Sequence, residues 1–304
     1  MEQKNNLYFI RRALLPLCLL LALFSCNPNE KSTEKGIIIL KDDLGRTLTL
    51  KRKPERVLPL ATSMTEMLYA VCDTASIVGR TPNCDYPATV LSKPVVNNYP
   101  VDYEAILRLK PDLVFTTEGI TPLEVAVRLE ELGIPVYYQK YGSVEDVFRG
   151  LEDIGKIMNR SQQAKYLTDS LRQQVTKIKE RHAGTTKLQT VLAITWKDPI
   201  YVYGQNTIFT DKLKILGSQN VVKQVYDQPY PALTRESILQ LDPDIFIGGT
   251  PEELEKEFFT MYPELRKIKA YRTKRMYDPT GNLMERPGPR VVESLLELEK
   301  FLYP

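Results

Sequence analysis

Short apolar runs alternate along the chain with longer segments in which apolar residues recur every three or four positions. Residues 37–40 and 47–50 flank Asp42-Asp-Leu-Gly45, which predicts a β-hairpin. Further on, strands are predicted at 56–60, 76–79, 113–116 and 135–138, with helices at 65–71, 104–109 and 122–132. Because this alternation is typical of parallel sheets covered by helices, the first half of the chain predicts an α/β lobe.

One helix is predicted to be much longer than the others. Residues 161–182 contain neither Gly nor Pro, and their apolar residues recur every three or four positions: Ala164, Leu167, Leu171, Val175 and Ile178. At a rise of about 1.5 Å per residue this helix would be about 33 Å long. It could therefore link two lobes as a rigid strut.

The strand and helix alternation resumes beyond residue 184. Strands are predicted at 190–195, 200–203 and 244–247, and helices at 210–216, 236–241, 251–261 and 290–302. We therefore predict two α/β lobes with central parallel sheets, residues 37–158 and 185–304, joined by a linking helix within 159–184. Each lobe has the size of an ordinary domain with its own core.

A nine-residue motif occurs in both predicted lobes. Glu104-Ala-Ile-Leu-Arg-Leu-Lys-Pro-Asp112 and Glu236-Ser-Ile-Leu-Gln-Leu-Asp-Pro-Asp244 share six residues, and each is followed by an apolar strand. The copies lie too far apart for a solenoid repeat, so they mark the same place in two similar lobes. Each Glu falls in the first turn of a helix, where a carboxylate interacts favourably with the helix dipole. Its recurrence also favours a paired role.

The N-terminus has the pattern of an export signal. Lys4, Arg11 and Arg12 precede an apolar run at 13–24 that is short for a membrane span, and Leu23-Phe-Ser-Cys26 follows. We predict a lipoprotein signal peptide at residues 1–25, a lipid anchor on Cys26, and a polar tether at 26–36. The mature protein is then predicted to be a membrane-anchored lipoprotein of the periplasm.

The net charge and the cysteines bear on two questions, whether the protein binds nucleic acid and whether it contains a disulfide. The formal net charge is +3, part of it in the signal segment, and no basic stripe indicates a nucleic-acid site. Cys72 and Cys84 remain after processing, in an oxidising compartment where disulfides are common. The predicted strand at 76–79 separates them by about 16 Å, whereas a disulfide needs Cα atoms within about 7 Å. We therefore predict two free thiols.

Catalytic motifs are not found in the sequence. His182 is the one histidine, in a charged stretch where a structural or solvated role is expected, so neither a Ser-His-Asp triad nor a His-rich zinc site can be built. No glycine-rich phosphate loop opens a helix. A hydrolytic enzyme is therefore a remote alternative that no motif supports. A surface adhesin, which would need neither a catalytic site nor a transport partner, is a further alternative.

Tyrosine is enriched, with 17 Tyr against 9 Phe and 1 Trp. Several aromatic residues follow predicted strands or lie in turns: Tyr86, Tyr99, Trp196, Tyr201 and Tyr230. Ligands of open parallel sheets bind beyond the carboxyl ends of the strands, so these rings are expected to line a cleft between the two lobes. Ordinary packing at the edges of the sheets is the alternative interpretation.

Several segments together resemble the periplasmic binding proteins of cobalamin and iron-siderophore importers. They are Asp42-Asp-Leu-Gly-Arg46, Pro54-Glu-Arg-Val57 with Thr65-Glu66, Cys84-Asp-Tyr-Pro87, both Pro-Asp repeats and Glu285-Arg-Pro-Gly-Pro-Arg290. The resemblance implies two Rossmann-like lobes on one long helix, a monomer without enzymatic activity or cofactor, and an ABC permease and its ATPase as partners. It also implies that Glu104 and Glu236 dock into arginine pockets of the permease, a contact that can be bidentate.

The resemblance is greatest to the cobalamin members of this family. It rests on Asp85-Tyr-Pro87, on Pro229-Tyr-Pro231 before Thr234-Arg-Glu236, and on Met284-Glu-Arg286. A corrinoid ligand is therefore expected, with no metal ligand from the protein. The implied ligand-binding residues are Thr62, Ser63, Tyr86, Tyr99, Trp196, Tyr201, Tyr230, Met284 and Arg286. Cobalamin binders often carry Trp where this chain has Asn98 and Thr117, so a ferric siderophore or haem remains an alternative ligand.

Overall fold

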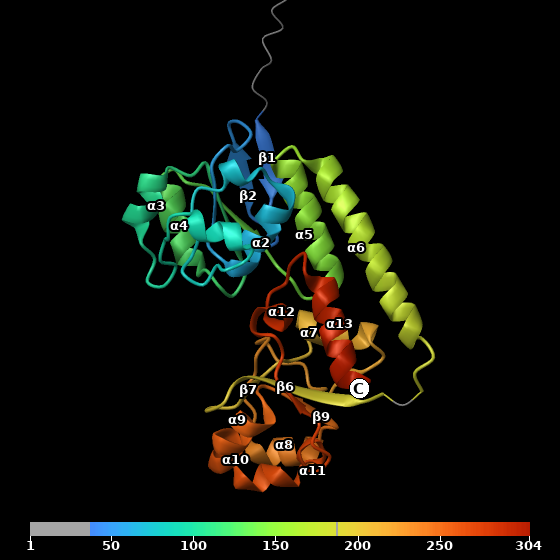
Figure 1. Cartoon of the computed structure of the whole chain (residues 1–304). Coiled ribbons are helices and arrows are strands. Elements are labelled where there is room, and N and C mark those ends of the chain that lie inside the picture. Colours follow the sequence, from blue (N-terminus) through green and yellow to red (C-terminus); the bar gives the residue numbers. More distant parts are fainter. Residues whose placement is uncertain (1–36, 187) are drawn as a thin grey trace, which may run out of the picture. The chain divides into compact units, whose positions relative to one another are not determined.

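The computed structural model describes residues 37–186 and 188–304 (Figure 1). The predicted signal peptide, Cys26 and the tether lie outside the described residues, so the expectations for them stay predictions. In the described part of the chain, no helix has both the length and the apolar character needed to cross a membrane.

The first sheet has three parallel strands in the order β3-β4-β5: β3 (Val57–Pro59), β4 (Leu113–Thr117) and β5 (Val136–Gln139). Its helices are α2 (Thr62–Val71), α3 (Tyr103–Leu109), α4 (Leu123–Glu131) and α5 (Val144–Ile157). Three of these four helices are predicted by the sequence pattern, and α5 is an addition. All five side chains of β4 are buried, which fits a central parallel strand.

The prediction of a strand at 76–79 is wrong. Residues Thr74–Ser76 form a short 3-10 helix, η1, and only Ile77 pairs, in an isolated parallel bridge with Val57. The cause is local, because the Asp73 side chain accepts a hydrogen bond from the amide of Ala75 at 3.0 Å and so favours a turn. A second 3-10 helix, η2 (Ala88–Ser92), follows in the same connection.

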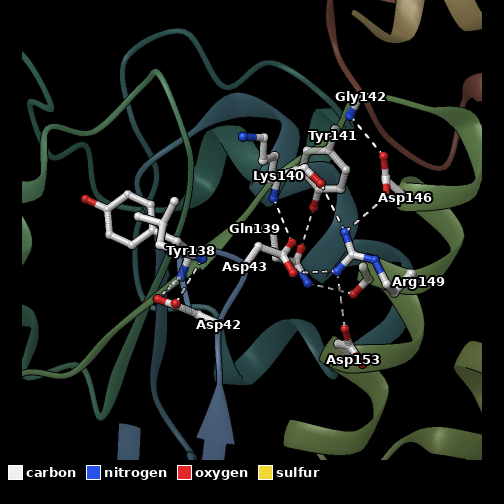
Figure 2. Close-up of polar contacts among 12 residues, drawn as sticks. Asp42, Asp43, Tyr138, Gln139, Lys140, Tyr141, Gly142, Asp146, Arg149 and Asp153 are labelled. Atoms are coloured by element: carbon white, nitrogen blue, oxygen red, sulfur yellow. Dashed lines mark hydrogen bonds and ion pairs between the residues drawn. The ribbon is translucent and has the colours of Figure 1, made fainter. Parts of the chain in front are cut away.

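The predicted hairpin is present as β1 (Ile38–Lys41) and β2 (Thr47–Leu50), paired antiparallel. Figure 2 shows how its turn is held against the end of β5 and the start of α5. Asp43 accepts hydrogen bonds from the Lys140 amide at 2.8 Å and from Arg149 at 2.6 Å, while Asp42 binds Arg46 at 2.7 Å. The Asp-Asp-Leu-Gly-Arg segment therefore fixes the hairpin on the fold.

The long helix α6 spans Ser161–His182, the range that the sequence pattern predicts. It runs beside α5 and also contacts α2, α7 (Ile208–Ile215) and α13 (Val291–Leu302), so it packs against helices from both halves of the chain (Figure 1). At its end the Nε2 atom of His182 lies 2.7 Å from Glu299 Oε1, and the imidazole stacks on Tyr303. His182 therefore has the structural role expected for it.

The second sheet has the order β10-β9-β6-β7, with β8 paired to β6. Its strands are β6 (Thr190–Trp196), β7 (Tyr201–Val202), β8 (Gln219–Asn220), β9 (Ile245–Ile247) and β10 (Met276–Tyr277). Strand β7 pairs antiparallel with β6, so this sheet is mixed and not purely parallel as predicted. The short loop between β6 and β7 permits only a hairpin-like return of the chain.

Helices around the second sheet complete the fold. Besides α7 and α13 they are α8 (Arg235–Leu241), α9 (Pro251–Lys256), α10 (Phe258–Met261), η3 (Pro263–Lys267), α11 (Lys269–Arg272) and α12 (Gly281–Glu285). The helix predicted at 251–261 is divided at Glu257 into α9 and α10. Phe258 and Phe259 of α10 are fully buried against Phe246 of β9, which anchors this segment in the core.

The two cysteines predicted to stay unpaired are both free thiols in the structure. The Cys84 Sγ atom is buried and lies 2.9 Å from the Thr65 hydroxyl and 3.1 Å from that of Thr81. Burial raises the pKa of Cys72 to about 12, so its thiol stays protonated at neutral pH and reacts poorly.

Candidate functional site

A cavity of about 480 Å³ lies at the carboxyl ends of β6, β9 and β10. This is the end of the sheet where α/β proteins bind ligands, and the volume is in the usual range for ligand sites. Its lining consists of Ile194, Thr195, Trp196, Lys197, Asp198, Gly248, Asp278, Pro279, Gly281, Met284 and Glu285. Trp196 and Met284 are the two predicted ligand-binding residues among them.

Trp196 provides the most exposed apolar surface of this cavity. Its side chain is 63% exposed, and its indole N–H donates a hydrogen bond to the Asp198 carbonyl oxygen at 2.8 Å. That bond fixes the ring while leaving its face open. A large aromatic ring held in this way is typical of a binding platform, because it buries much surface at little conformational entropy.

The inner wall of the cavity depends on a close approach of two strands. Gly248 follows β9, and a Cβ atom at this position would lie only 2.2 Å from Ile194 Cγ1 of β6. Glycine is therefore required for the backbone to pass here. Met284 of α12 is buried and belongs to the hydrophobic core, so it joins the cavity wall to the packed interior.

The cavity carries more negative than positive side chains. Asp198, Asp278 and Glu285 line it together with Lys197, and Lys197 forms an ion pair with Glu257. Burial raises the pKa of Asp278, and the charges of Glu253 and Glu297 raise it further. Burial also raises the pKa of Glu285.

Tyr230 lies beside this acidic wall. Its ring meets that of Tyr203 edge to face, with centroids 5.4 Å apart. Burial raises the pKa of both phenols, and the charge of Glu285 raises both further. Tyr230 is therefore close to the Glu285 edge of the cavity, and its phenol is held in the neutral form at physiological pH.

Arg286 is already occupied by the protein. Its guanidinium donates to Glu66 at 3.2 Å, to Asp85 at 2.5 Å and to the Asn83 carbonyl oxygen at 2.9 Å, and only 10% of the side chain is exposed. The sequence resemblance implied that Arg286 binds the ligand directly. In the structure its N–H donors instead hold the loop of residues 83–86.

Arg290 holds the same loop from a second side. Its guanidinium donates to both Glu66 oxygens, at 2.6 and 2.8 Å, and its Cζ atom lies 4.1 Å from the centroid of the Tyr86 ring. We define Glu66, Arg286 and Arg290 as the Glu66 cluster. It joins α2 to the segment after α12, so Tyr86 is connected to the wall of the cavity through neighbouring residues.

The remaining predicted ligand-binding residues are less closely connected to the cavity. Thr62 begins α2, and Ser63 next to it is buried. Tyr201 lies opposite Trp196 in the β6–β7 pair. Tyr99 is 91% exposed and does not line the cavity. The sequence interpretation did not single out the polar lining residues Lys197, Asp198 and Asp278, although the first two lie two and three residues beyond the predicted strand 190–195.

Within the described residues no group of three or more His, Cys, Asp or Glu side chains could hold a metal ion.

Comparison with known proteins identifies the family. The periplasmic binding protein family matches residues 57–282, most of the chain. This chain belongs to that family. An ABC transporter substrate-binding lipoprotein of Bacillus subtilis, YvrC, is 27% identical over 90% of this chain and 88% of its own length. The vitamin B12-binding protein of Vibrio parahaemolyticus is 24% identical over 83% of this chain and 91% of its own length.

Solved structures agree with this assignment. A possible iron-binding periplasmic solute-binding protein of Staphylococcus epidermidis superposes with a TM-score of 0.73 and 29% identity, over 83% of this chain and all of that one. The present protein is therefore an extracytoplasmic substrate-binding protein of an ABC importer, from a family without enzymatic activity, and its partners are the permease and ATPase of that importer.

Both repeat glutamates of this binding protein are exposed at equivalent helix starts. Glu104 is the second residue of α3 and Glu236 the second residue of α8, and their side chains are 90% and 67% exposed. Each helix is followed by a capping residue in the left-handed conformation, Lys110 or Asp242.

The repeated aspartate explains why the two copies fold alike. Asp112 accepts hydrogen bonds from the Glu55 and Arg56 amides, just before β3, and Asp244 accepts one from the Thr190 amide at the start of β6. In each sheet this bond ties the incoming strand to its neighbour. The repeat therefore marks the same structural position twice, as predicted.

A lysine of the binding protein is buried behind the cavity. Lys212 of α7 is fully buried and donates to the Ser294 hydroxyl at 2.8 Å and to the Met284 carbonyl oxygen at 3.3 Å. Burial lowers its pKa to about 7, although the charge of Glu297 acts in the opposite direction. Lys212 thereby links α12, which lines the cavity, to α13.

Replacing Lys212 with Met should stabilise the protein relative to wild type at low pH and lose this advantage as the pH rises. Between pH 7 and 10, Lys212 is protonated in the unfolded state but neutral in the folded state. The free energy of unfolding of wild type should therefore rise, relative to that of the variant, by about 1.4 kcal/mol per pH unit. Urea unfolding of both proteins across this range measures the difference. Lys214→Met, at an exposed position of the same helix, is the control. A difference that does not change with pH would contradict the prediction.

Proposed function

We propose that this binding protein captures a corrinoid and delivers it to an ABC importer while anchored to the membrane by a lipid on Cys26. The observation that carries the proposal is the cavity at the strand ends with the open face of Trp196 and the buried Met284 in its walls. A flat and bulky metal chelate can bury much of its surface against such a ring, while polar groups at the rim fix its orientation.

The choice of a corrinoid is supported by the relatives. Proteins named as vitamin B12-binding match this chain at 24 to 26% identity.

Haem or a ferric siderophore is the second candidate. It is favoured by the structural likeness to the possible iron-binding protein of Staphylococcus epidermidis. Both ligand classes would use the same cavity, so the binding experiment below must include them.

The proposed function includes the predicted domain organisation. Two lobes, 37–158 and 185–304, would hold the ligand in a cleft between them, with the linking helix in 159–184 restricting their movement. Tyr86, Tyr99, Tyr201, Tyr230, Thr62 and Ser63 would add contacts around the ligand, and Arg286 would act by holding the Tyr86 loop. Glu104 and Glu236 would dock on the permease.

Calorimetric titration of the mature protein with cyanocobalamin, its base-free precursor, haem and a ferric siderophore tests the proposal. We expect tight binding of the corrinoids, and a loss of about tenfold or more for Trp196→Ala because a central aromatic contact is removed. Tyr166→Ala is the matched control, since Tyr166 is 81% exposed on α6 and outside the cavity. Binding of haem or the siderophore alone would replace the corrinoid as ligand.

A further inference from the structure

Two carboxyl groups of the cavity, those of Asp278 and Glu285, differ in their contacts from the other charged groups there. Among the described residues, neither the Asp278 nor the Glu285 side chain takes part in a hydrogen bond or ion pair, although both line the cavity. Polar groups that lose water on ligand binding need a replacement partner, since an unsatisfied acceptor is costly to bury. A ligand that covers these two carboxyl groups is therefore expected to donate hydrogen bonds to them.

The basic groups near the cavity form their ion pairs with other residues, although the charges of Lys197 and Arg286 still act on Asp278 and Glu285. Lys197 is paired with Glu257, and its neighbour Asp198 accepts a hydrogen bond from the Tyr262 hydroxyl at 2.9 Å. Arg286 and Arg290 follow Glu285 in the chain, but both are held by Glu66. Among the described lining residues, acidic side chains thus outnumber basic ones, with Asp198, Asp278 and Glu285 against Lys197.

We propose that Asp278 and Glu285 make the cavity selective for metal chelates whose edge carries amide or amine N–H groups, and against chelates whose edge carries carboxylates. This inference rests on the proposed function and specifies its ligand class. Amide N–H groups can donate to the two carboxylates, whereas a carboxylate edge would bring like charges together in a partly dehydrated site.

The test compares two corrinoids that share one ring system. Dicyanocobinamide has an amide edge, and dicyanocobyrinic acid has carboxylates in the same places. Wild-type protein should bind the amide form at least about 100-fold more tightly at pH 7.5, in line with the cost of like charges at an interface. For Asp278→Asn/Glu285→Gln, which keeps size and shape, this ratio should fall below about tenfold. Glu252→Gln/Glu293→Gln removes the same charge at exposed positions outside the cavity and should retain the wild-type ratio.

The outcomes separate this inference from the proposed function. Equal affinity of wild type for the two corrinoids, or an unchanged ratio in the cavity variant, overturns the inference and leaves a corrinoid-binding protein. If neither corrinoid binds, haem and a neutral ferric trihydroxamate are compared in the same way. Tighter binding of haem, with its two propionates, contradicts the inference, and tighter binding of the amide-rich trihydroxamate supports it. Binding of no chelate removes the proposed function and the inference together.

Discussion

Replacing both Glu104 and Glu236 with Ala should abolish ligand uptake while leaving ligand affinity unchanged. Both carboxylates are exposed at the second position of a helix, outside the cavity. The repeat places these two helices at equivalent positions beside the two sheets. Charge-assisted contacts to arginines of the permease would disappear in the variant. Each single variant should already reduce uptake about tenfold, because truncating one partner of a docked charge pair leaves the other unpaired.

Uptake of labelled ligand by cells or proteoliposomes, together with calorimetry of the isolated protein, measures the two effects separately. Glu124→Ala/Glu252→Ala is a close control, because both residues are exposed glutamates in the first turns of other helices, α4 and α9. This control should transport like wild type. Normal transport by the Glu104/Glu236 variant would exclude the docking role.

Replacing Glu66 with Ala should destabilise the protein by about 3 to 5 kcal/mol, the usual effect of removing one partner from a buried ion pair. The Glu66 side chain is 1% exposed and accepts hydrogen bonds from Arg286 and Arg290. Without it, two guanidinium groups that are largely shielded from water lose their shared counter-ion. The Tyr86 loop, which both arginines contact, should loosen at the same time.

Chemical denaturation of wild type and variant measures the free energy of unfolding. Glu131→Ala is the control, because Glu131 forms an ion pair with Arg128 at a similar distance, 2.8 Å, but both side chains are about 60% exposed. Such an exposed pair contributes at most about 1 kcal/mol. Equal losses in the two variants would show that the Glu66 cluster contributes no more than a surface pair.

Helix α5 shows where the sequence interpretation was incomplete. Its apolar residues Val144, Val147, Leu151 and Ile154 recur at helical spacing and are buried. Ser143 and Asp146 form a capping box at its start, which is a signal readable from the sequence. The helix could therefore have been predicted, whereas the 3-10 helix η1 depends on a single Asp73 contact that competes with a plausible strand.

The candidate site was only partly predictable. Trp196 follows an apolar strand, so its place at the strand end was evident from the order of elements. Asp278 follows β10, whose two residues are too few for a periodic pattern. The role of Arg286 was also hidden, because its partners Glu66 and Asp85 lie about 200 residues away in the chain.

The sequence by itself determined the elements whose signals are local. The range of α6, the hairpin and the equivalent places of Glu104 and Glu236 follow from periodicity, turn residues and helix starts within a few positions of one another. Only the tertiary structure decided that Lys212 is buried, that Glu66 binds two arginines, and that Asp278 and Glu285 line one cavity without forming a hydrogen bond or ion pair to another described residue. Burial and pairing depend on residues distant in the chain, and folding alone brings these together.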